Sequence, residues 1–450
     1  MIFFQQNTYF GSKNLIFVSK ATNFINIFEN KKKCVVLKIR TLVRQKSFIM
    51  NIKKGLLIIT LCFGSIFLSC DKNNNTENNR DVQTSLQQIA DSVYNVFNDK
   101  WGIDSQGVFI YINGPTGTYM ASSNITPKPT PNSHFRIASI TKTFTAAAIM
   151  LLQQQGMLNI NDFISEYIPN TPAYNIPYRN QITIKQLLQH RAGVFDVTNN
   201  AMPVTINAPY AGVKYEDYIR DQDDEHTFTF DELVGLNAEH QLSTAAPDAG
   251  FYYSNTGYNI LGKIIEEVSG LTYSEFIDQK FLIPLSLTNT YSVSQGSDVE
   301  MRTPYIDSYL YIKGEDKINT SQDNMSVHVT EGNIVSSPKD ITTWMQLLLT
   351  GNAGVNASNV ALMKEMLPAD SGHGVYGLGL VYDEGLGYGH NGAHLSYVSS
   401  LRYNPENGIT VLASANFIRI DPADPSQASV FELGYGIRDA CNVAVSEYQK

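Results

Sequence analysis

Hydrophobic residues recur at helical spacing in three stretches of the chain. The stretch 134–156 holds an apolar run that ends at Gly156, and its spacing predicts a helix buried on at least one face. Amphipathic helices are predicted over 82–97 and over 430–445. The apolar positions that carry these predictions are Phe144, Ala147, Ala148, Leu151 and Leu152 in the first stretch, Val82, Leu86, Ile89, Val93 and Phe97 in the second, and Val430, Leu433, Ile437, Cys441 and Val445 in the third.

Strand-like segments lie near the two ends of this region. Residues 107–114 and 117–123 flank a Gly-Pro-Thr-Gly turn and predict a β-hairpin. Residues 395–404 and 408–417 flank a Pro-Glu-Asn-Gly turn and predict a second hairpin. Because the pattern between the hairpins is mostly helical, the sequence predicts an α+β fold. We expect one antiparallel β-sheet built from both chain ends, flanked by helices, with an all-helical subdomain in the middle.

The N-terminal region has the pattern of an export signal. Residues 50–69 begin with a start-like Met and two lysines, continue with about fifteen apolar or small residues, and precede Cys70. Residues 67–70 resemble the lipobox of bacterial lipoproteins, although Phe67 is unusual there, so Cys70 is predicted to carry a lipid anchor. We therefore expect an exported lipoprotein, anchored to a membrane and facing the periplasm or the cell surface.

The same pattern sets the expected domain boundaries. Residues 1–49 hold nine basic residues and one acid without a clear period, and we expect them to be unstructured and to derive from translation upstream of Met50. An N-terminal extension is the alternative. Residues 70–81 are polar and Asn-rich, which predicts a flexible tether. A single domain is expected over 82–447.

Charge and cysteine content exclude several classes of function. The formal net charge is −9, and residues 1–69 hold eleven basic residues against one acid, so the remainder carries about −19. Phosphates would repel so acidic a domain, and no nucleic acid is expected as a partner. Only Cys441 lies inside the expected domain, so neither a disulfide framework nor a cysteine metal site is predicted. No cofactor or metal is expected.

The first candidate for chemistry is the pair Ser139 and Lys142. Their spacing of three residues at the start of a predicted helix places both side chains on one face. An amine whose pKa is lowered by burial can take a hydroxyl proton, and backbone N–H groups at a helix start can stabilise negative charge. The alternative is a capping serine followed by a solvated lysine.

Two further segments carry candidate groups. Tyr253-Ser254-Asn255 lies in a loop just before an amphipathic pattern over 260–268. A phenol near a lysine can relay protons, and an amide can hold a substrate amide. His390-Asn391-Gly392 lies in a glycine-rich segment ahead of a predicted strand, where a ligand can approach the backbone closely. Each segment is also compatible with an ordinary turn.

The three segments together, in this order, resemble the three motifs of the penicillin-recognising serine hydrolases. This family comprises the class C β-lactamases, the D-alanyl-D-alanine carboxypeptidases and related esterases. Residues 156–170, 182–196 and 331–351 resemble the connecting segments of the family, and the similarity covers about 82–447. The resemblance implies a β-lactamase/transpeptidase-like fold.

The resemblance also assigns a role to each motif residue. Ser139 would be the nucleophile that forms an acyl-enzyme, and Lys142 and Tyr253 would share the proton transfers. Asn255 would hold the amide of the substrate, and the backbone N–H groups of Ser139 and Ala393 would form the oxyanion hole.

The third motif completes the expected substrate site. His390, Asn391 and Gly392 would line it. Two residues depart from the family pattern: His390 replaces a lysine common in β-lactamases, and Asn391 replaces the usual Thr or Ser. The second change puts tight binding of a free substrate carboxylate in doubt.

The sequences of the motifs are most similar to those of the soluble D-alanyl-D-alanine carboxypeptidases. We therefore expect a carboxypeptidase-type peptidase that acts on peptidoglycan peptides. A class C-like β-lactamase, an esterase or a D-amino-acid amidase is the alternative, and each would take a small-molecule or peptide substrate. An alternative of another class is a non-catalytic receptor for β-lactams or cell-wall fragments. The oligomeric state does not follow from the sequence.

Overall fold

The computed structural model describes residues 74–450, except 104–105, 371 and 425–426. The predicted signal segment 50–69, the anchor Cys70 and the expected upstream segment 1–49 lie outside the described residues. Helix α2 begins at Asn74, so the flexible tether expected over 70–81 is corrected from residue 74 onward. Polar composition alone predicted a coil there, but each residue added to an existing helix gains a hydrogen bond, and α2 is nucleated by its own buried face.

The described elements include strands of two to eight residues and α-helices of five to 28 residues. The helices are α2 (Asn74–Trp101), α3 (Lys142–Gln154), α4 (Ile184–Leu188), α5 (Tyr215–Arg220), α6 (Phe230–Glu239), α7 (Asn255–Ser269), α8 (Tyr273–Ile277), α9 (Pro338–Leu349), α10 (Ala357–Met363) and α11 (Ala428–Tyr448). The strands are β1 (Val108–Gly114), β2 (Gly117–Ser123), β3 (Phe135–Arg136), β4 (Tyr291–Ser292), β5 (Tyr309–Ile312), β6 (Ile318–Asn319), β7 (Ile334–Ser336), β8 (Leu367–Pro368), β9 (Val375–Tyr376), β10 (Val381–Asp383), β11 (Gly387–His394), β12 (Tyr397–Asn404), β13 (Ile409–Ala415) and β14 (Phe417–Ile420).

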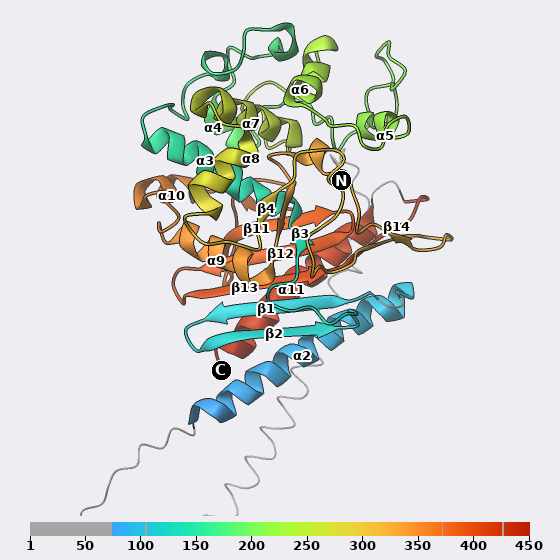
Figure 1. Cartoon of the computed structure of the whole chain (residues 1–450), viewed down its shortest axis with the longest axis vertical. Coiled ribbons are helices and arrows are strands. Elements are labelled where there is room, and N and C mark those ends of the chain that lie inside the picture. The colour runs from blue at the N-terminus through green and yellow to red at the C-terminus, as the bar shows by residue number, and fades with distance from the viewer. Residues whose placement is uncertain (1–73, 104–105, 371, 425–426) are drawn as a thin grey trace, which may run out of the picture. The chain divides into compact units, whose positions relative to one another are not determined.

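One antiparallel sheet joins the two ends of the described chain. Its strand order is β2-β1-β13-β12-β11-β10-β9-β8, so the N-terminal hairpin pairs directly with the C-terminal strands (Figure 1). Gly114 faces Gly117 across the first turn, and Asn404 faces Ile409 across the second. Both predicted hairpins and the α+β fold class are thereby confirmed.

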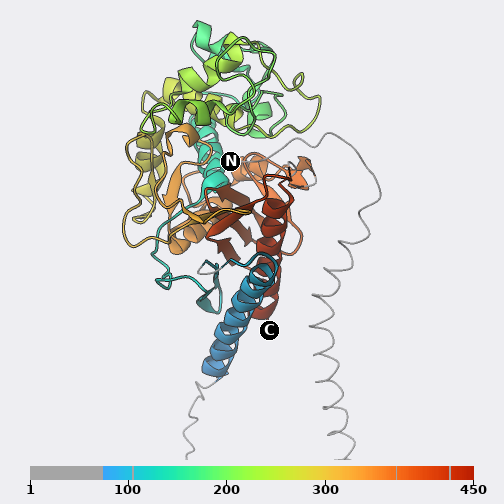
Figure 2. The same cartoon turned by 90° about the vertical axis from the view of Figure 1, so that its right-hand side faces the viewer.

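Both faces of this sheet are buried, as the pattern of β1 shows. Val108, Ile110 and Ile112 point to one face and pack with apolar residues of α2 and α11. Phe109 and Tyr111 point to the other face, where they join the cluster built around α3 and α9. This alternation follows from the two-residue period of a strand. Helices α2 and α11 run together along one face of the sheet (Figure 2).

The middle of the chain forms the predicted helical subdomain. The elements described between β3 and β4 are all helical, and Figure 1 shows them grouped on the side of the sheet opposite α2. Two three-stranded sheets, β14-β5-β6 and β3-β7-β4, join this subdomain to the main sheet. In the first of them β14 pairs with β5 in parallel. The candidate site lies where the subdomain meets β11.

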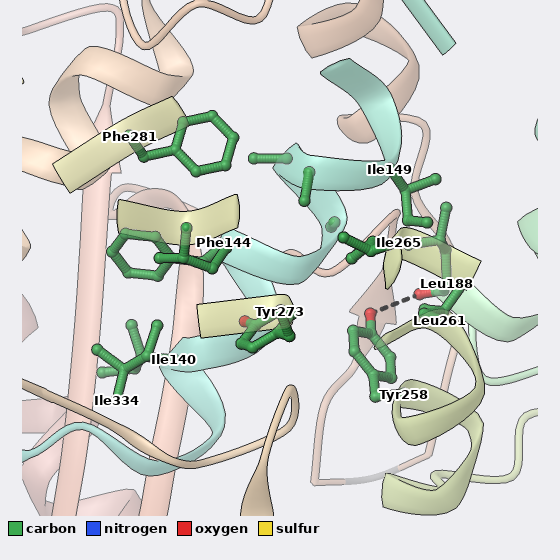
Figure 3. Packing of buried hydrophobic residues seen from close by; sticks show 14 of the residues in the cluster. Ile140, Phe144, Ile149, Leu188, Tyr258, Leu261, Ile265, Tyr273, Phe281 and Ile334 are labelled. Atoms are coloured by element: carbon green, nitrogen blue, oxygen red, sulfur yellow. Dashed lines mark hydrogen bonds between the residues drawn. The ribbon is translucent and has the colours of Figure 1, made fainter. Parts of the chain in front are cut away.

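Helix α3 is buried on all sides, not only on one face. Every side chain from Lys142 to Leu152 is buried. The ring of Phe144 stacks on Trp344 with centroids 3.8 Å apart, and the Tyr258 hydroxyl of α7 donates to Leu188 O at 3.0 Å (Figure 3). A helix enclosed in this way is held rigidly by close packing. The residues at its N-terminus are therefore fixed in place.

Candidate active site

Ser139 lies in a tight turn immediately before the buried helix. The turn is the 3₁₀ segment Ala138–Thr141, and Lys142 is the first residue of α3. Ala138 has φ +50°, a left-handed conformation that is costly for a residue with a Cβ atom. This conformation sets the direction of the backbone immediately before Ser139. Lys142 Nζ donates to Ser139 Oγ at 3.2 Å. The predicted hydroxyl–amine pair is thus formed. Ser139 is buried in this pair, with 1% of its surface exposed.

Lys142 is surrounded by oxygen acceptors. Its Nζ donates to Asn255 Oδ1 at 2.8 Å, to Glu331 O at 2.8 Å and to Glu331 Oε2 at 3.3 Å. Burial lowers the pKa of Lys142, while the negative charges of Glu331 and Asp196 oppose this shift. The lysine is therefore a buried amine whose basicity depends on a neighbouring carboxylate.

Tyr253 joins Ser139 from the loop before α7. Its ring stacks between His190, with centroids 4.1 Å apart, and His373, with centroids 5.0 Å apart. Its hydroxyl interacts with the side chain of Ser139, and Lys142 Nζ lies 5.0 Å from its ring centroid. Burial raises the pKa of Tyr253 well above its usual value, so the group is a neutral phenol at pH 7.

Asn255 reaches the same centre from the first turn of α7. Ser254 caps this helix by accepting from Gly257 N at 3.2 Å, which fixes the backbone on both sides of the cap. The amide of Asn255 accepts from Lys142 and donates to Thr198 Oγ1 at 2.9 Å. These bonds orient the amide; its expected contact with a substrate stays a prediction.

The third motif lies within a strand, which corrects its predicted place ahead of one. His390, Asn391 and Gly392 all belong to β11. Glycines usually mark turns, but here they permit close contact: a Cβ atom on Gly389 would lie 1.9 Å from Leu401 O, and one on Gly392 would lie 2.4 Å from Ile137 O.

Gly392 therefore sets β11 directly against the turn of Ser139. The pairing of β11 with β10 stops at Gly389, and the strand beyond it lines a pocket. Ala393, whose N–H is expected in the oxyanion hole, also lines that pocket. A free strand segment beside a nucleophile can receive a substrate backbone.

His390 is neutral and fully enclosed. Its Nε2 lies 2.8 Å from Tyr376 Oη and its Nδ1 lies 2.5 Å from Asn391 O, so the tautomer that satisfies both bonds has the proton on Nδ1. Burial holds the pKa of His390 well below its usual value. The imidazole that replaces the family's lysine therefore brings no positive charge.

Asn391 is engaged by an arginine. Its Oδ1 accepts from Arg402 Nη2 at 2.8 Å, and the same guanidinium is paired with Asp383 at 2.7 Å. Arg402 is 1% exposed, so its charge is neutralised inside the protein. Asn391, which departs from the family pattern, is thus held in place by its hydrogen bond to the buried Arg402.

One pocket brings most of the predicted residues together. It is lined by Ser139, Tyr253, Gly372, His373, His390, Asn391, Gly392, Ala393, Val398, Ser399, Val430, Phe431, Gly434, Tyr435 and Arg438. Lys142 and Asn255 lie behind Ser139 and complete the centre through their hydrogen bonds. The far wall of the pocket comes from α11.

Several residues of this centre carry no signal in the sequence. Glu331 reaches Lys142 from a segment 189 residues away and is itself bonded to His328. Tyr376 and His373 approach from β9 and the loop before it. Glu331 does open the segment that resembles the family, which is the one local hint of its place. Among the described residues, no group of three or more His, Cys, Asp or Glu side chains is arranged to hold a metal ion. No helix of the described part is both long and apolar enough to cross a membrane.

An antiparallel sheet covered by helices, with a buried serine and lysine at the head of the central helix, is the architecture of the β-lactamase/transpeptidase-like fold. The sequence profile of the Beta-lactamase family matches residues 98–422. The chain therefore belongs to this family and is a serine hydrolase of the β-lactamase and penicillin-binding protein superfamily.

Relatives and solved structures agree with this assignment. The chain is 32% identical over 167 residues to Protein flp of Staphylococcus aureus, and 30% identical over 182 residues to Penicillin-binding protein 4* of Bacillus subtilis. These matches cover 36% and 40% of this chain, but only 29% and 35% of those two proteins. The fold resembles D-amino acid amidase from Ochrobactrum anthropi complexed with D-phenylalanine, with TM-score 0.65, 22% identity and coverage of 82% of this chain and 99% of that one. It also resembles a D-stereospecific amidohydrolase from Streptomyces sp., with TM-score 0.64, 22% identity and coverage of 74% and 94%.

Proposed function

We propose that the protein is a D-alanyl-D-alanine carboxypeptidase-type peptidase that cleaves short peptides through an acyl-enzyme on Ser139. The observation that carries the proposal is the convergence of Ser139, Lys142 and Tyr253 beside a pocket that ends at Arg438. A nucleophilic hydroxyl with a buried amine and a phenol in contact is suited to acyl transfer. The pocket wall on α11 is suited to recognise the leaving end of a substrate.

The proposed reaction follows from the contacts of Ser139. Its Oγ attacks the carbonyl carbon of the peptide bond while its proton passes to Lys142 Nζ, 3.2 Å away. The N–H groups of Ser139 and Ala393 stabilise the oxyanion that forms. The neutral phenol of Tyr253 donates a proton to the departing nitrogen and regains one from Lys142. Water then attacks the ester on Ser139 and releases the shortened peptide.

Arg438 supports a substrate with a free carboxylate. It lies at the pocket wall with 33% of its side chain exposed, and its nearest acidic partners stand 4.0 Å away at Asp383 and 3.8 Å away at Asp439. Asp383 is already bonded more closely to Arg402. A guanidinium paired so loosely can form a charge-assisted bond with a substrate carboxylate. It would supply the charge that His390 does not bring.

A D-amino-acid amidase is the second candidate. The strand next to Ser139 offers a neutral imidazole and an amide already bonded to Arg402, which is compatible with an uncharged leaving group. D-amino acid amidases are also among the structural neighbours. In this case Arg438 would make no contact with the substrate.

The experiment compares two substrates that differ in this group. The purified protein is incubated with a peptide ending in D-Ala-D-Ala and with D-alanine amide, and the release of D-Ala or ammonia is measured. Nitrocefin and a p-nitrophenyl ester are assayed in parallel, with mass spectrometry for an adduct on Ser139. The proposal predicts release of D-Ala from the peptide, and Ser139→Ala should abolish it.

Arg438→Gln is the discriminating variant. Loss of one charge-assisted bond costs about 1.5–3 kcal/mol, so KM for the peptide should rise roughly 10- to 100-fold while ester turnover is unchanged. Turnover of the amide alone would favour the amidase, rapid nitrocefin hydrolysis a β-lactamase, and ester turnover alone an esterase. A stable penicillin adduct without turnover of any substrate would favour the receptor.

We further propose that the domain works outside the cytoplasm, anchored by a lipid on Cys70. Support comes from the signal pattern of residues 50–69 and the cysteine that follows it. Cells that express the full chain would be labelled with a radioactive fatty acid and fractionated. Label in the membrane fraction that disappears in Cys70→Ala is expected, and soluble unlabelled protein would contradict the proposal.

A further inference from the structure

Two carboxylate–imidazole pairs lie back to back behind the nucleophile. In the first pair, His328 Nδ1 lies 2.5 Å from Glu331 Oε1. In the second, His394 Nε2 lies 2.7 Å from Asp323 Oδ2. The two imidazole rings meet edge to face with centroids 4.3 Å apart. All four side chains are at most 4% exposed, so none is an ordinary surface charge.

The inner pair ends on the lysine of the active site. Glu331 Oε2 lies 3.3 Å from Lys142 Nζ, and the carbonyl oxygen of the same residue accepts from Nζ at 2.8 Å. Glu331 therefore holds Lys142 with both its backbone and its side chain. The outer pair ends on Arg220, which is paired with Asp323 at 2.8 Å and is 27% exposed. The two pairs and their end groups thus form a continuous series of side chains from Lys142 to the partly exposed Arg220.

The protonation states in this series follow from the contacts. Lys142, His328 and His394 hold the pKa of the Glu331 carboxyl at about 2 despite its burial, so it is an anion at pH 7. An anion so placed stabilises the ammonium form of Lys142 against the desolvation that destabilises it. Three of the oxygens around Nζ can only accept, namely Asn255 Oδ1, Glu331 O and Glu331 Oε2, and they match the three N–H donors of an ammonium group.

We propose that Glu331, held by His328, is a positioning residue that keeps Lys142 as an ammonium at rest and thereby sets the pH above which Ser139 can be acylated. The inference rests on the proposed function, because it concerns the base of that reaction. Lys142 must lose one proton before it can accept the proton of Ser139, and the Glu331 anion makes this loss harder. The rate of acylation should therefore rise with pH as Lys142 loses this proton.

The other groups that face the lysine do not replace Glu331. Asp196 adds negative charge from farther away, and its oxygens are bonded to Asn199 Nδ2 at 2.6 Å and to Asn255 N at 2.9 Å. The rings of Tyr253 and Tyr258 face Nζ at 5.0 and 5.3 Å and are neutral phenols. His190 and His390 also feel the charge of Lys142; burial keeps both neutral. Glu331 is therefore the anion in direct contact.

The test is the pH dependence of acylation by a fluorescent penicillin from pH 5 to 10. The measured quantity is the second-order rate constant of labelling, with Ser139→Ala as the blank. Glu331→Gln keeps the shape and removes the charge, so the rising limb should move to lower pH by at least about one unit, a tenfold change in the ionisation constant of Lys142. Glu331→Asp retains the charge and should keep the wild-type limb. His328→Ala should move it in the same direction as Glu331→Gln by a smaller amount.

A matched control separates charge from structure. Asp340→Asn also removes a buried carboxylate, one bonded to Asn289 N at 2.7 Å and to Thr290 at 3.2 Å, and should leave the limb in place. A Glu331→Gln limb at the wild-type pH, with only a lower plateau, would show a purely structural role and overturn the inference. Absence of labelling in the wild type would instead overturn the proposed function.

A measurement on the wild-type protein covers the case in which the variants do not fold. Lysine labelled with ¹³C is titrated by NMR, and the Cε signal of Lys142 is assigned by its loss in Lys142→Arg. An ammonium shift at pH 7 is expected. A neutral-amine shift at pH 7 would overturn the inference whatever the variants do.

Discussion

Gly392→Ala tests whether β11 forms one wall of the oxyanion hole. A Cβ atom added at Gly392 would lie 2.4 Å from Ile137 O, which is 0.6 Å inside the 3.0 Å limit that real Cβ atoms respect. The obstructing atom is backbone and cannot rotate away. Ile137 stands two residues before Ser139, so the strand or the nucleophile turn must move. Either movement separates the N–H groups of Ser139 and Ala393.

The expected size of the effect follows from this displacement. Loss of one oxyanion donor lowers kcat by about 10²–10³-fold, or roughly 3–4 kcal/mol of transition-state stabilisation. Overpacking at a tight contact costs a further ~1–3 kcal/mol of stability. KM should change much less than kcat, because the hole acts on the transition state.

The assay is ester turnover, with unfolding followed in urea. The control is Gly235→Ala in α6, where the added Cβ would meet Ala173 Cβ at 3.7 Å, an ordinary contact. This variant should keep full activity and gain up to ~1 kcal/mol of stability from better helix propensity. A folded Gly392→Ala protein with kcat within threefold of wild type would refute the assigned oxyanion hole.

Three further outcomes concern stability. Burial lowers the pKa of His394 from 6.5 to about 4, so the unfolded chain binds more protons than the folded one between these pH values. The free energy of unfolding should therefore fall as pH drops from 6.5 to 4, by about 3 kcal/mol from this group alone. Urea midpoints at pH 7.5, 5.5 and 4.5 measure this change, and a midpoint that does not move would contradict it. Trp344→Ala removes the stack on Phe144 and should cost about 3–5 kcal/mol in the same unfolding assay, whereas a loss below 1 kcal/mol would show that the site collapses around the gap. Ser337→Ala removes the oxygen that accepts from Asp340 N at 3.2 Å at the start of α9 and should cost ~1 kcal/mol without changing ester turnover; lost turnover would mean that α9 shapes the site.

Local patterns predicted the elements whose cause is local. The alternation of β1 and the Gly-Pro-Thr-Gly turn specify the first hairpin without reference to the rest of the chain. The spacing of Ser139 and Lys142 places both groups correctly, since a helix begins there in any fold that accepts the sequence. The pattern predicted that α3 is buried on at least one face, and this is confirmed. Burial of its other faces did not follow, because polar residues such as Thr145 interrupt the pattern; Thr145 Oγ1 donates to Thr330 O at 2.5 Å inside the core.

Contacts between distant segments explain what local patterns could not show. The glycines of β11 predicted that a ligand could approach the backbone closely, with an ordinary turn as the alternative. That Leu401 and Ile137 are the groups packed against them is seen only in the fold. Likewise Glu331 lies 189 residues from Lys142, and no spacing rule links a carboxylate to an amine across that distance. Such residues are found only from coordinates, because tertiary packing decides which charges meet.

Specificity follows the same logic as the active centre. The sequence raised doubt about carboxylate binding because Asn391 replaces a hydroxyl residue. The structure shows why Asn391 is poorly placed to bind a carboxylate: its Oδ1 accepts a hydrogen bond from Arg402, and Arg402 is itself ion-paired with Asp383. The pocket cation is then Arg438, in a helix nearly fifty residues farther along the chain. Because Asn391 replaces the usual hydroxyl residue on β11, we expect Arg438 on α11 to select the substrate. A change of charge at Arg438 can then alter selectivity without a change at Ser139.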